Sequence, residues 1–225
     1  MKLLLIDTET NGLPKNRHAP IADSDMWPAI LQLSWTVCEV QGRTLTNLGS
    51  RDIGLALSAS VAWDTGAAAI HGLEEAECRY GTAPVDALTE LRAVLRGVDC
   101  VVAHNLAFDK PVLRAAAWAV GIKDLWPTNT AELCTMRATQ DLVRLPSPYY
   151  GPDSGKFKAP KLNELYAWLY GHVYDISGAV LHSAKSDTHC LYHCLLGLLK
   201  KGYLEARAGS LCMRSPSPLS GKARA

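Results

Sequence analysis

The stretch "VDCVVAHN", residues 98–105, places the strongest restriction on how this chain can fold. Between Asp99 and His104 it is short and apolar, with no alternation of polar and apolar side chains. A strand of this kind is typical of the centre of a sheet that is covered on both faces. The chain is therefore expected to build a sheet with helices packed on both sides.

Strand patterns come first in the chain, and helical patterns follow. Apolar or alternating runs predict strands at residues 2–7, 30–40 and 44–53, which are expected to form a meander. Periodic apolar residues predict a short helix ending near Gly72 and further helices at 84–95, 111–120 (with Pro111 in its first turn), 162–171 and 186–202. This order predicts one α/β domain, in which a mixed sheet of a three-strand meander plus parallel strands is flanked by helices.

Composition limits the classes of protein to which the chain can belong. It has 225 residues, of which 48% are hydrophobic, enough to fill the core of one domain or, at a stretch, two small ones. The formal net charge is +1, so binding to a polyanion would need a local basic patch. None of the seven cysteines forms a Cys-x-x-Cys pair, which suits reduced thiols in a cytosol. No apolar stretch reaches the ~20 residues that span a bilayer, so we expect a cytoplasmic protein without a membrane partner.

The C-terminal stretch from Ala206 onward differs from the rest in composition. It is rich in Ser, Pro and Arg and offers little to bury. We therefore expect one domain over residues 1–205 and a flexible tail over residues 206–225.

Asp7 and Glu9 end the first predicted strand, in "IDTETNGLP". Side chains two apart in a strand point to the same face, and like charges side by side are costly unless something positive lies between them. The pair thus suggests a bound cation, although a turn entry rich in Asp, Thr, Asn and Gly gives the same pattern.

Two further stretches place carboxylates at the ends of predicted elements. Asp109 follows the central strand in "AHNLAFDK", where α/β sheets place ligands, and it could equally cap the next helix. Asp187 opens the last long helix in "LHSAKSD", five residues after His182, which could simply be a solvated loop residue. Together, four carboxylates and a histidine at such positions fit Mg²⁺ or Mn²⁺, two of which can act jointly in a phosphoryl displacement.

The stretches "IDTETNGLP", "VVAHNLAFDKPVL" and "LHSAKSD", in this order, resemble the three motifs of the DEDDh branch of the DnaQ-like 3′→5′ exonucleases, in the RNase T superfamily. That family includes the epsilon proofreading subunit of bacterial replicative DNA polymerase, and residues 13–35 are similar to stand-alone and phage-type members. The likeness runs from Met1 to about Leu199. It implies an RNase H-like fold and the release of nucleoside 5′-monophosphates from the 3′ ends of single strands.

The resemblance also implies a role for each matched residue. Asp7, Glu9 and Asp187 would hold one metal ion and Asp7 would reach a second. Asp109 would also belong to the metal site and support it, in part through metal-bound water. His182 would take a proton from the attacking water, and its H-x-x-x-x-D spacing to Asp187 is that of the His branch rather than the Tyr branch. Family members grip the terminal nucleotides near the first two motifs, and the matching residues here are Thr10, Leu13, Asn105 and Phe108.

Several interpretations stay open. DNA is the favoured substrate; an RNA-trimming exoribonuclease or oligoribonuclease is the alternative, and a non-catalytic nucleic-acid-binding module is less expected. Besides the 3′ ends of single-stranded DNA or RNA, a polymerase or other replication, repair or defence proteins are candidate partners. Segment 144–161 interleaves cations with aromatic rings, which suits a flap over a single strand or an ordinary solvated loop. His189 and His193 have the spacing of a zinc site but lack two further evident ligands, and Phe108 suits core packing better than base stacking.

Overall fold

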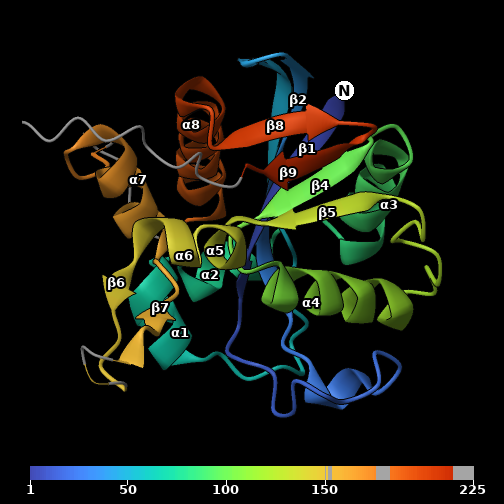
Figure 1. Cartoon of the computed structure of the whole chain (residues 1–225). Coiled ribbons are helices and arrows are strands. Elements are labelled where there is room, and N and C mark those ends of the chain that lie inside the picture. The colour runs from blue at the N-terminus through green and yellow to red at the C-terminus, as the bar shows by residue number, and fades with distance from the viewer. Residues whose placement is uncertain (150, 152–153, 176–182, 215–225) are drawn as a thin grey trace, which may run out of the picture.

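A five-stranded mixed sheet forms the centre of the molecule (Figure 1). The computed structural model describes residues 1–149, 151, 154–175 and 183–214. The strands lie in the order β3-β2-β1-β4-β5. Strands β1, β2 and β3 form an antiparallel meander, whereas β4 and β5 run parallel to β1. The bounds of the strands are Lys2–Thr10 for β1, Ile30–Gln41 for β2, Thr44–Gly54 for β3, Cys100–Ala103 for β4 and Ala131–Cys134 for β5. The predicted mixed sheet is thus confirmed.

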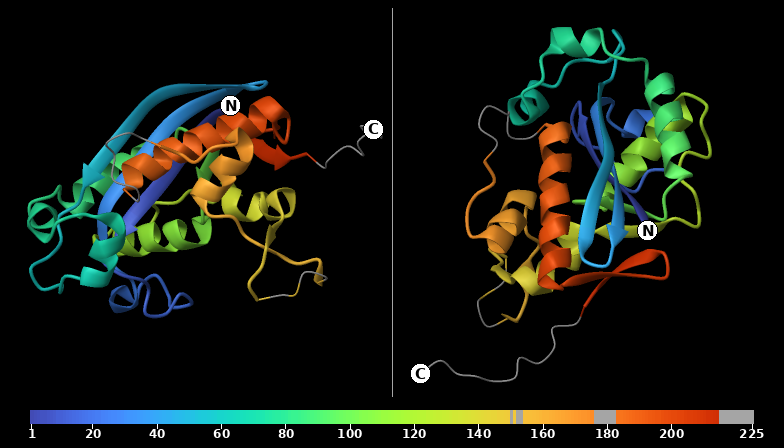
Figure 2. Two further views of the ribbon diagram at one scale, coloured as in Figure 1. Left: turned by 90° about the vertical axis from the view of Figure 1, so that its left-hand side faces the viewer. Right: turned by 90° about the horizontal axis from the view of Figure 1, so that it is seen from above.

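Helices cover both faces of this sheet, as the apolar run at β4 predicted. Helix α8 (Ala184–Lys201) and helix α7 (Leu162–Tyr170) pack on one face, and α3 (Pro84–Leu95) and α4 (Leu106–Ala119) pack on the other (Figure 2). Strand β1 serves both cores, because successive side chains point to opposite faces. Leu3 and Leu5 join the α8 side while Leu4 and Ile6 join the α3 and α4 side, and all four are fully buried.

Short elements connect these layers. A 3₁₀ turn interrupts the long loop between β1 and β2, and two short helices lie between β3 and α3. Two more short helices and a small hairpin connect β5 to α7. The bounds are Ser24–Met26 for η1, Thr65–His71 for α1, Glu75–Arg79 for α2, Thr135–Ala138 for α5, Gln140–Val143 for α6, Leu145–Pro146 for β6 and Phe157–Lys158 for β7.

Helix α4 begins five residues before the start that was predicted from the position of Pro111. The prediction placed Pro111 in the first turn of a helix over residues 111–120, but the helix starts at Leu106 and Pro111 lies inside it. The residue that caps this helix is Asn105, in the left-handed region at φ 87°. Asparagine adopts this conformation more readily than other residues with a Cβ, so the chain can turn sharply here from β4 into α4. The suggestion that Asp109 caps the helix is therefore wrong.

The segment that follows α8 is ordered beyond the predicted boundary at residue 205. Strands β8 (Leu204–Arg207) and β9 (Ser210–Met213) pair as an antiparallel hairpin. Leu204 and Leu211 are buried in the same core as α8. Composition misled here because the abundant Ser and Arg concealed a few apolar residues that alternate along a strand. Part of the predicted tail, residues 215–225, lies outside the described residues.

The expectation about membranes concerns the helices. Within the part of the chain that the structure describes, no helix is both long and apolar enough to cross a bilayer. The cytoplasmic location stays a prediction.

Truncating a buried side chain of the hairpin should destabilise the whole domain. Leu204 is only 1% exposed, so Leu204→Ala leaves a cavity and should lower the free energy of unfolding by about 2–4 kcal/mol. Urea unfolding followed by circular dichroism measures this change. Arg207→Ala, an exposed position on the same strand, is the control and should change it by less than about 0.5 kcal/mol. Equal midpoints for Leu204→Ala and the parent protein would show that the hairpin is independent of the core.

Candidate active site

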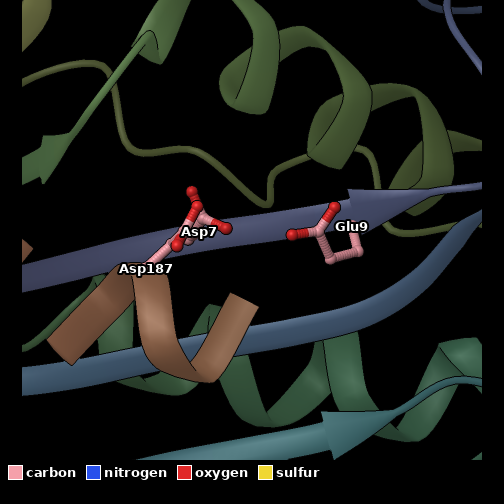
Figure 3. Close-up of side chains that lie close together, drawn as sticks. All are labelled: Asp7, Glu9 and Asp187. Atoms are coloured by element: carbon pink, nitrogen blue, oxygen red, sulfur yellow. The ribbon is translucent and has the colours of Figure 1, made fainter. Parts of the chain in front are cut away.

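Three carboxylates from two elements converge at the end of β1. Asp7 and Glu9 project from β1 toward α8, and Asp187 comes from the first turn of α8 (Figure 3). One oxygen from each lies within 4.8 Å of the others, and all three side chains are half-buried. The two residues at the strand end and the distant Asp187 are thus brought together as the sequence motifs predicted.

Burial and mutual repulsion raise the pKa values in this cluster. Burial raises the pKa of Asp7 well above its ordinary value, and Asp109, Asp187 and Glu9 raise it further. Burial, with the neighbouring Asp187 and Asp109, raises the pKa of Glu9 to about 8. No lysine or arginine among the described residues lowers either pKa. The carboxylates are therefore held where a proton or a metal cation would relieve their repulsion.

Asp109 lies beside this cluster, on the α4 side of β1. Its side chain is 2% exposed and accepts a hydrogen bond of 2.8 Å from the hydroxyl of Thr8. Burial raises the pKa of Asp109 to about 7, although the Thr8 hydroxyl acts in the opposite direction. Its charge reaches Asp7 and Glu9, but it is not one of the three groups whose ligand atoms converge within 4.8 Å.

Thr8 is a residue of the site that the motifs did not single out. It stands between the two carboxylates in sequence, so it points to the opposite face of β1 and meets α4. A threonine between two acidic residues of a strand is the only sequence signal for this contact.

His182 lies outside the described residues, so its place relative to the cluster stays a prediction. The residue after it, Ser183, caps helix α8 and accepts a hydrogen bond from the backbone of Ser186. The start of the helix that carries Asp187 is therefore fixed directly after His182.

The four predicted substrate-binding residues differ in how much of each is exposed to solvent. Thr10 is buried, and its hydroxyl donates to the carbonyl oxygen of Gly12, so it stabilises the turn after β1. Leu13, in contrast, is 80% exposed. Asn105 is half-buried at the start of α4, and Phe108 packs against the core on that side of the sheet. The part of each in substrate binding stays a prediction.

His104 proves to be a structural residue. One ring nitrogen lies 2.9 Å from the hydroxyl of Thr135, and the other lies 3.0 Å from the carbonyl oxygen of Pro160. Burial lowers the pKa of His104 to about 4, although the bond to Pro160 opposes this shift. The neutral ring thus joins the end of β4 to the segment that leads into α7.

Two of the cations in segment 144–161 contact other residues of the protein. Arg144 lies over the ring of Phe157, and Lys158 forms an ion pair with Glu164 of α7. Two of the four cations thus contact neighbouring residues of the protein, and the choice between a flap and a solvated loop stays a prediction.

The suggestion of zinc binding on α8 receives no support. His189 lies against the hydroxyl of Tyr174, and its ring packs edge-on against that of His193. Across the described ranges, Asp7, Glu9 and Asp187 form the one group of His, Cys, Asp or Glu residues that could hold an ion.

Comparison with solved structures identifies the fold. The sheet and its helices superpose on E. coli exonuclease I in complex with a dT13 oligonucleotide at a TM-score of 0.65 and 14% identity, over 88% of this chain and 40% of that one. The zinc-bound complex of E. coli exonuclease I with single-stranded DNA gives 0.65 and 14%, over 89% and 41%. A further structure of exonuclease I gives a TM-score of 0.66 and 15% identity, over 88% of this chain and 41% of that one.

The chain has the fold of exonuclease I. The resemblance drawn from the motifs is thus confirmed at the level of the fold, and the mixed sheet is RNase H-like as predicted. This chain spans about 40% of the length of the exonuclease I chains. No protein-family model matches the sequence, and neither does the sequence of any curated protein. None of these comparisons supports the expectation of a polymerase partner.

The donor set of the cluster suits a hard divalent cation. Carboxylate oxygens are the ligands that Mg²⁺ and Mn²⁺ prefer, whereas structural zinc sites favour cysteine and histidine. Among the described residues, no lysine or arginine offsets the burial and repulsion that raise the pKa values of Asp7 and Glu9. The residues present therefore fit a metal ion, and Asp7, Glu9 and Asp187 are the ones that could hold it.

The free energy of unfolding of the metal-free protein should fall as pH rises. A carboxyl with a pKa of about 8 in the folded state and about 4.3 in the unfolded state releases its proton from the unfolded chain first. Glu9 therefore contributes full stability below about pH 4 and loses that contribution as pH rises to about 8. In EDTA, Glu9→Gln should melt higher than the parent at pH 8, by about 2–4 °C for about 1 kcal/mol.

Scanning calorimetry at pH 5 and pH 8 measures this difference, which should be smaller at pH 5. Asp86→Asn is the control, because Asp86 is exposed in the first turn of α3, away from the cluster. A Glu9→Gln variant that melted no higher than the parent at pH 8 would show that Glu9 is not under repulsion.

Proposed function

We propose that this protein is a metal-dependent 3′→5′ exonuclease that hydrolyses the terminal phosphodiester of single-stranded nucleic acid, with DNA favoured. The observation that carries the proposal is the convergence of Asp7, Glu9 and Asp187 within 4.8 Å on the fold of exonuclease I. An acidic cluster alone is common on proteins. Its position at the end of a central strand, and the absence of a lysine or arginine that lowers its pKa values within the described residues, favour a catalytic metal site.

Asp7, Glu9 and Asp187 would hold Mg²⁺ or Mn²⁺, two ions per site, with Asp7 reaching both. Such ions supply positive charge to the attacking and the leaving oxygens of a phosphoryl displacement. Asp109 would support the site through its negative charge, held in place by Thr8.

His182 would act as the general base. Water would attack the phosphorus of the terminal phosphodiester and pass its proton to the imidazole. The bond to the 3′ oxygen of the preceding nucleotide would break, and that oxygen would take up a proton from solvent. The products are a nucleoside 5′-monophosphate and a strand that is one nucleotide shorter, with a free 3′ hydroxyl. The motif spacing supports this assignment.

Single-stranded DNA is the favoured substrate because exonuclease I, whose fold this chain shares, has been solved in complex with dT13 and other DNA oligonucleotides. An RNA-trimming exoribonuclease with the same residues is the alternative. The intact carboxylate set argues against a non-catalytic binding module, which would be expected to lack one of its ligands.

Asp7→Asn and Asp187→Asn should each abolish degradation of a 5′-labelled single strand. In the parent protein, the label should move to shorter products from the 3′ end in Mg²⁺ or Mn²⁺ and stay intact in EDTA. Asp86→Asn, which removes an exposed carboxylate of α3, is the matched control and should keep the parent rate. Gel analysis of DNA and RNA strands of one sequence decides between the two substrates. Failure of the parent protein to shorten either polymer would refute the proposal.

His182→Ala should lower the rate of hydrolysis by about 10²–10⁴-fold, because the attacking water loses its proton acceptor. Its affinity for Mn²⁺, measured by calorimetric titration, should stay near that of the parent. His189→Ala, seven residues further along the chain, is the control for a lost imidazole. A His182→Ala variant with the parent rate would remove this residue from the mechanism.

A further inference from the structure

Strand β2 presents two polar residues beside the two carboxylates of β1. In the antiparallel register, Ser34 pairs with Asp7 and Gln32 pairs with Glu9. Paired residues of neighbouring strands point to the same face, so Ser34 and Gln32 face α8 as the carboxylates do. Each of them contacts the first turns of that helix, Gln32 through its side chain and Ser34 through its backbone.

The side chain of Gln32 connects the sheet to the first residue of α8. Its carbonyl oxygen Oε1 accepts a hydrogen bond of 3.0 Å from the backbone N–H of Ala184. Its amide nitrogen Nε2 donates a hydrogen bond of 3.0 Å to Oδ1 of Asp52 on β3. An ionised carboxylate can only accept, so Asp52 fixes which end of the amide faces Ala184.

The hydrogen bond from Ala184 to Gln32 lies in the first turn of α8, where the backbone N–H groups need acceptors from outside the helix. The first N–H groups of a helix have no acceptor within it. Ser183 satisfies that of Ser186, and Gln32 satisfies that of Ala184. Asp187 follows Ala184 by three residues, in the same turn. The position of this turn on the sheet therefore decides where the third carboxylate lies relative to Asp7 and Glu9.

A hydroxyl group and a charged side chain also stabilise the position of this turn. The hydroxyl of Thr188 donates to the carbonyl oxygens of Ala184 and of Ser34. Burial raises the pKa of Asp52, while the charge of Lys185, in the first turn of α8, acts against that shift. The positive charge of Lys185 thus attracts Asp52.

We propose that Gln32, oriented by Asp52, is a positioning residue that places Asp187 against Asp7 and Glu9 and so sets the affinity of the cluster for divalent metal. The part of this inference that concerns metal rests on the proposed function, whereas the hydrogen bond to Ala184 does not. Neither Gln32 nor Asp52 belongs to the three sequence motifs. The hydrogen bonds from Asp52 through Gln32 to Ala184 depend on the register of β1, β2 and β3 and on where α8 packs on the sheet.

Gln32→Met should weaken the binding of Mn²⁺ alone by about 10-fold or more, since groups that orient metal ligands commonly contribute 10–100-fold to affinity. Calorimetric titration measures the dissociation constant. Hydrogen exchange followed by NMR should show faster exchange of the Ala184 amide. Gln41→Met is the matched control, because Gln41 lies on the same strand and its side-chain amide donates to Glu39 rather than to α8, so both measurements should match the parent protein.

Asp52 supplies a second pair of variants that test orientation and not merely structure. Asp52→Ala leaves the amide of Gln32 without its fixed acceptor and should weaken Mn²⁺ binding about threefold. Asp52→Asn retains an oxygen that accepts from Nε2, so it should restore most of that loss. This pair tests the proposal if Gln32→Met fails to fold, because Asp52 is exposed and its substitution is mild.

Two outcomes would overturn the proposal. One is a folded Gln32→Met protein with the parent affinity for Mn²⁺ and the parent exchange rate at Ala184. The other is equal loss in Asp52→Ala and Asp52→Asn. If the parent protein bound no Mn²⁺, the proposed function would fail instead, and exchange at Ala184 would still decide whether Gln32 holds the helix.

Discussion

The burial of β1 is the constraint on which the rest of the site depends, because it fixes two like-charged carboxylates, Asp7 and Glu9, at the end of one strand. Asp7 and Glu9 extend a strand whose segment Leu3–Ile6 is fully buried on both faces. A close-packed core resists displacement, so the two groups cannot separate by moving the strand. Burial, together with the charges of Asp187 and Asp109, raises the pKa values of both groups. The hydrophobic core thus holds in place an electrostatic arrangement that the isolated chain would avoid.

The two faces of β1 contribute differently to this arrangement. On the α4 side, Asp109 is enclosed and receives the hydroxyl of Thr8, so its charge is partly compensated by a hydrogen bond. On the α8 side, the cluster is only half-buried and meets a helix N-terminus. The carboxylates on the α8 side are therefore more accessible to a cation than Asp109 is. The sheet separates a supporting carboxylate from those that could bind metal.

How much could be predicted from the sequence depended on whether the signal was local. Strands β1 to β4 and the carboxylates at element ends were predicted, because periodicity and short motifs carry them, whereas the short strand β5 was not singled out. The start of α4 was missed because a proline can lie in the first turn of a helix or further inside it. In addition, Asn105 makes no capping hydrogen bond with its side chain and instead turns the chain through a left-handed backbone conformation. The contacts of Thr8 and Gln32 could not be predicted, because each depends on which residue of another element lies opposite.

The chemistry of the third carboxylate follows from its place on a helix. The N-terminus of α8 carries partial positive charge, so Asp187 is more easily accommodated in its first turn than on another strand. The residue of β2 beside Glu9 that binds this turn, Gln32, is neutral. A lysine or arginine in place of Gln32 would lie beside Glu9 in the register and would neutralise the cluster it was meant to position. An amide can satisfy a helix N–H without adding charge, so the negative potential of the site remains available to a cation.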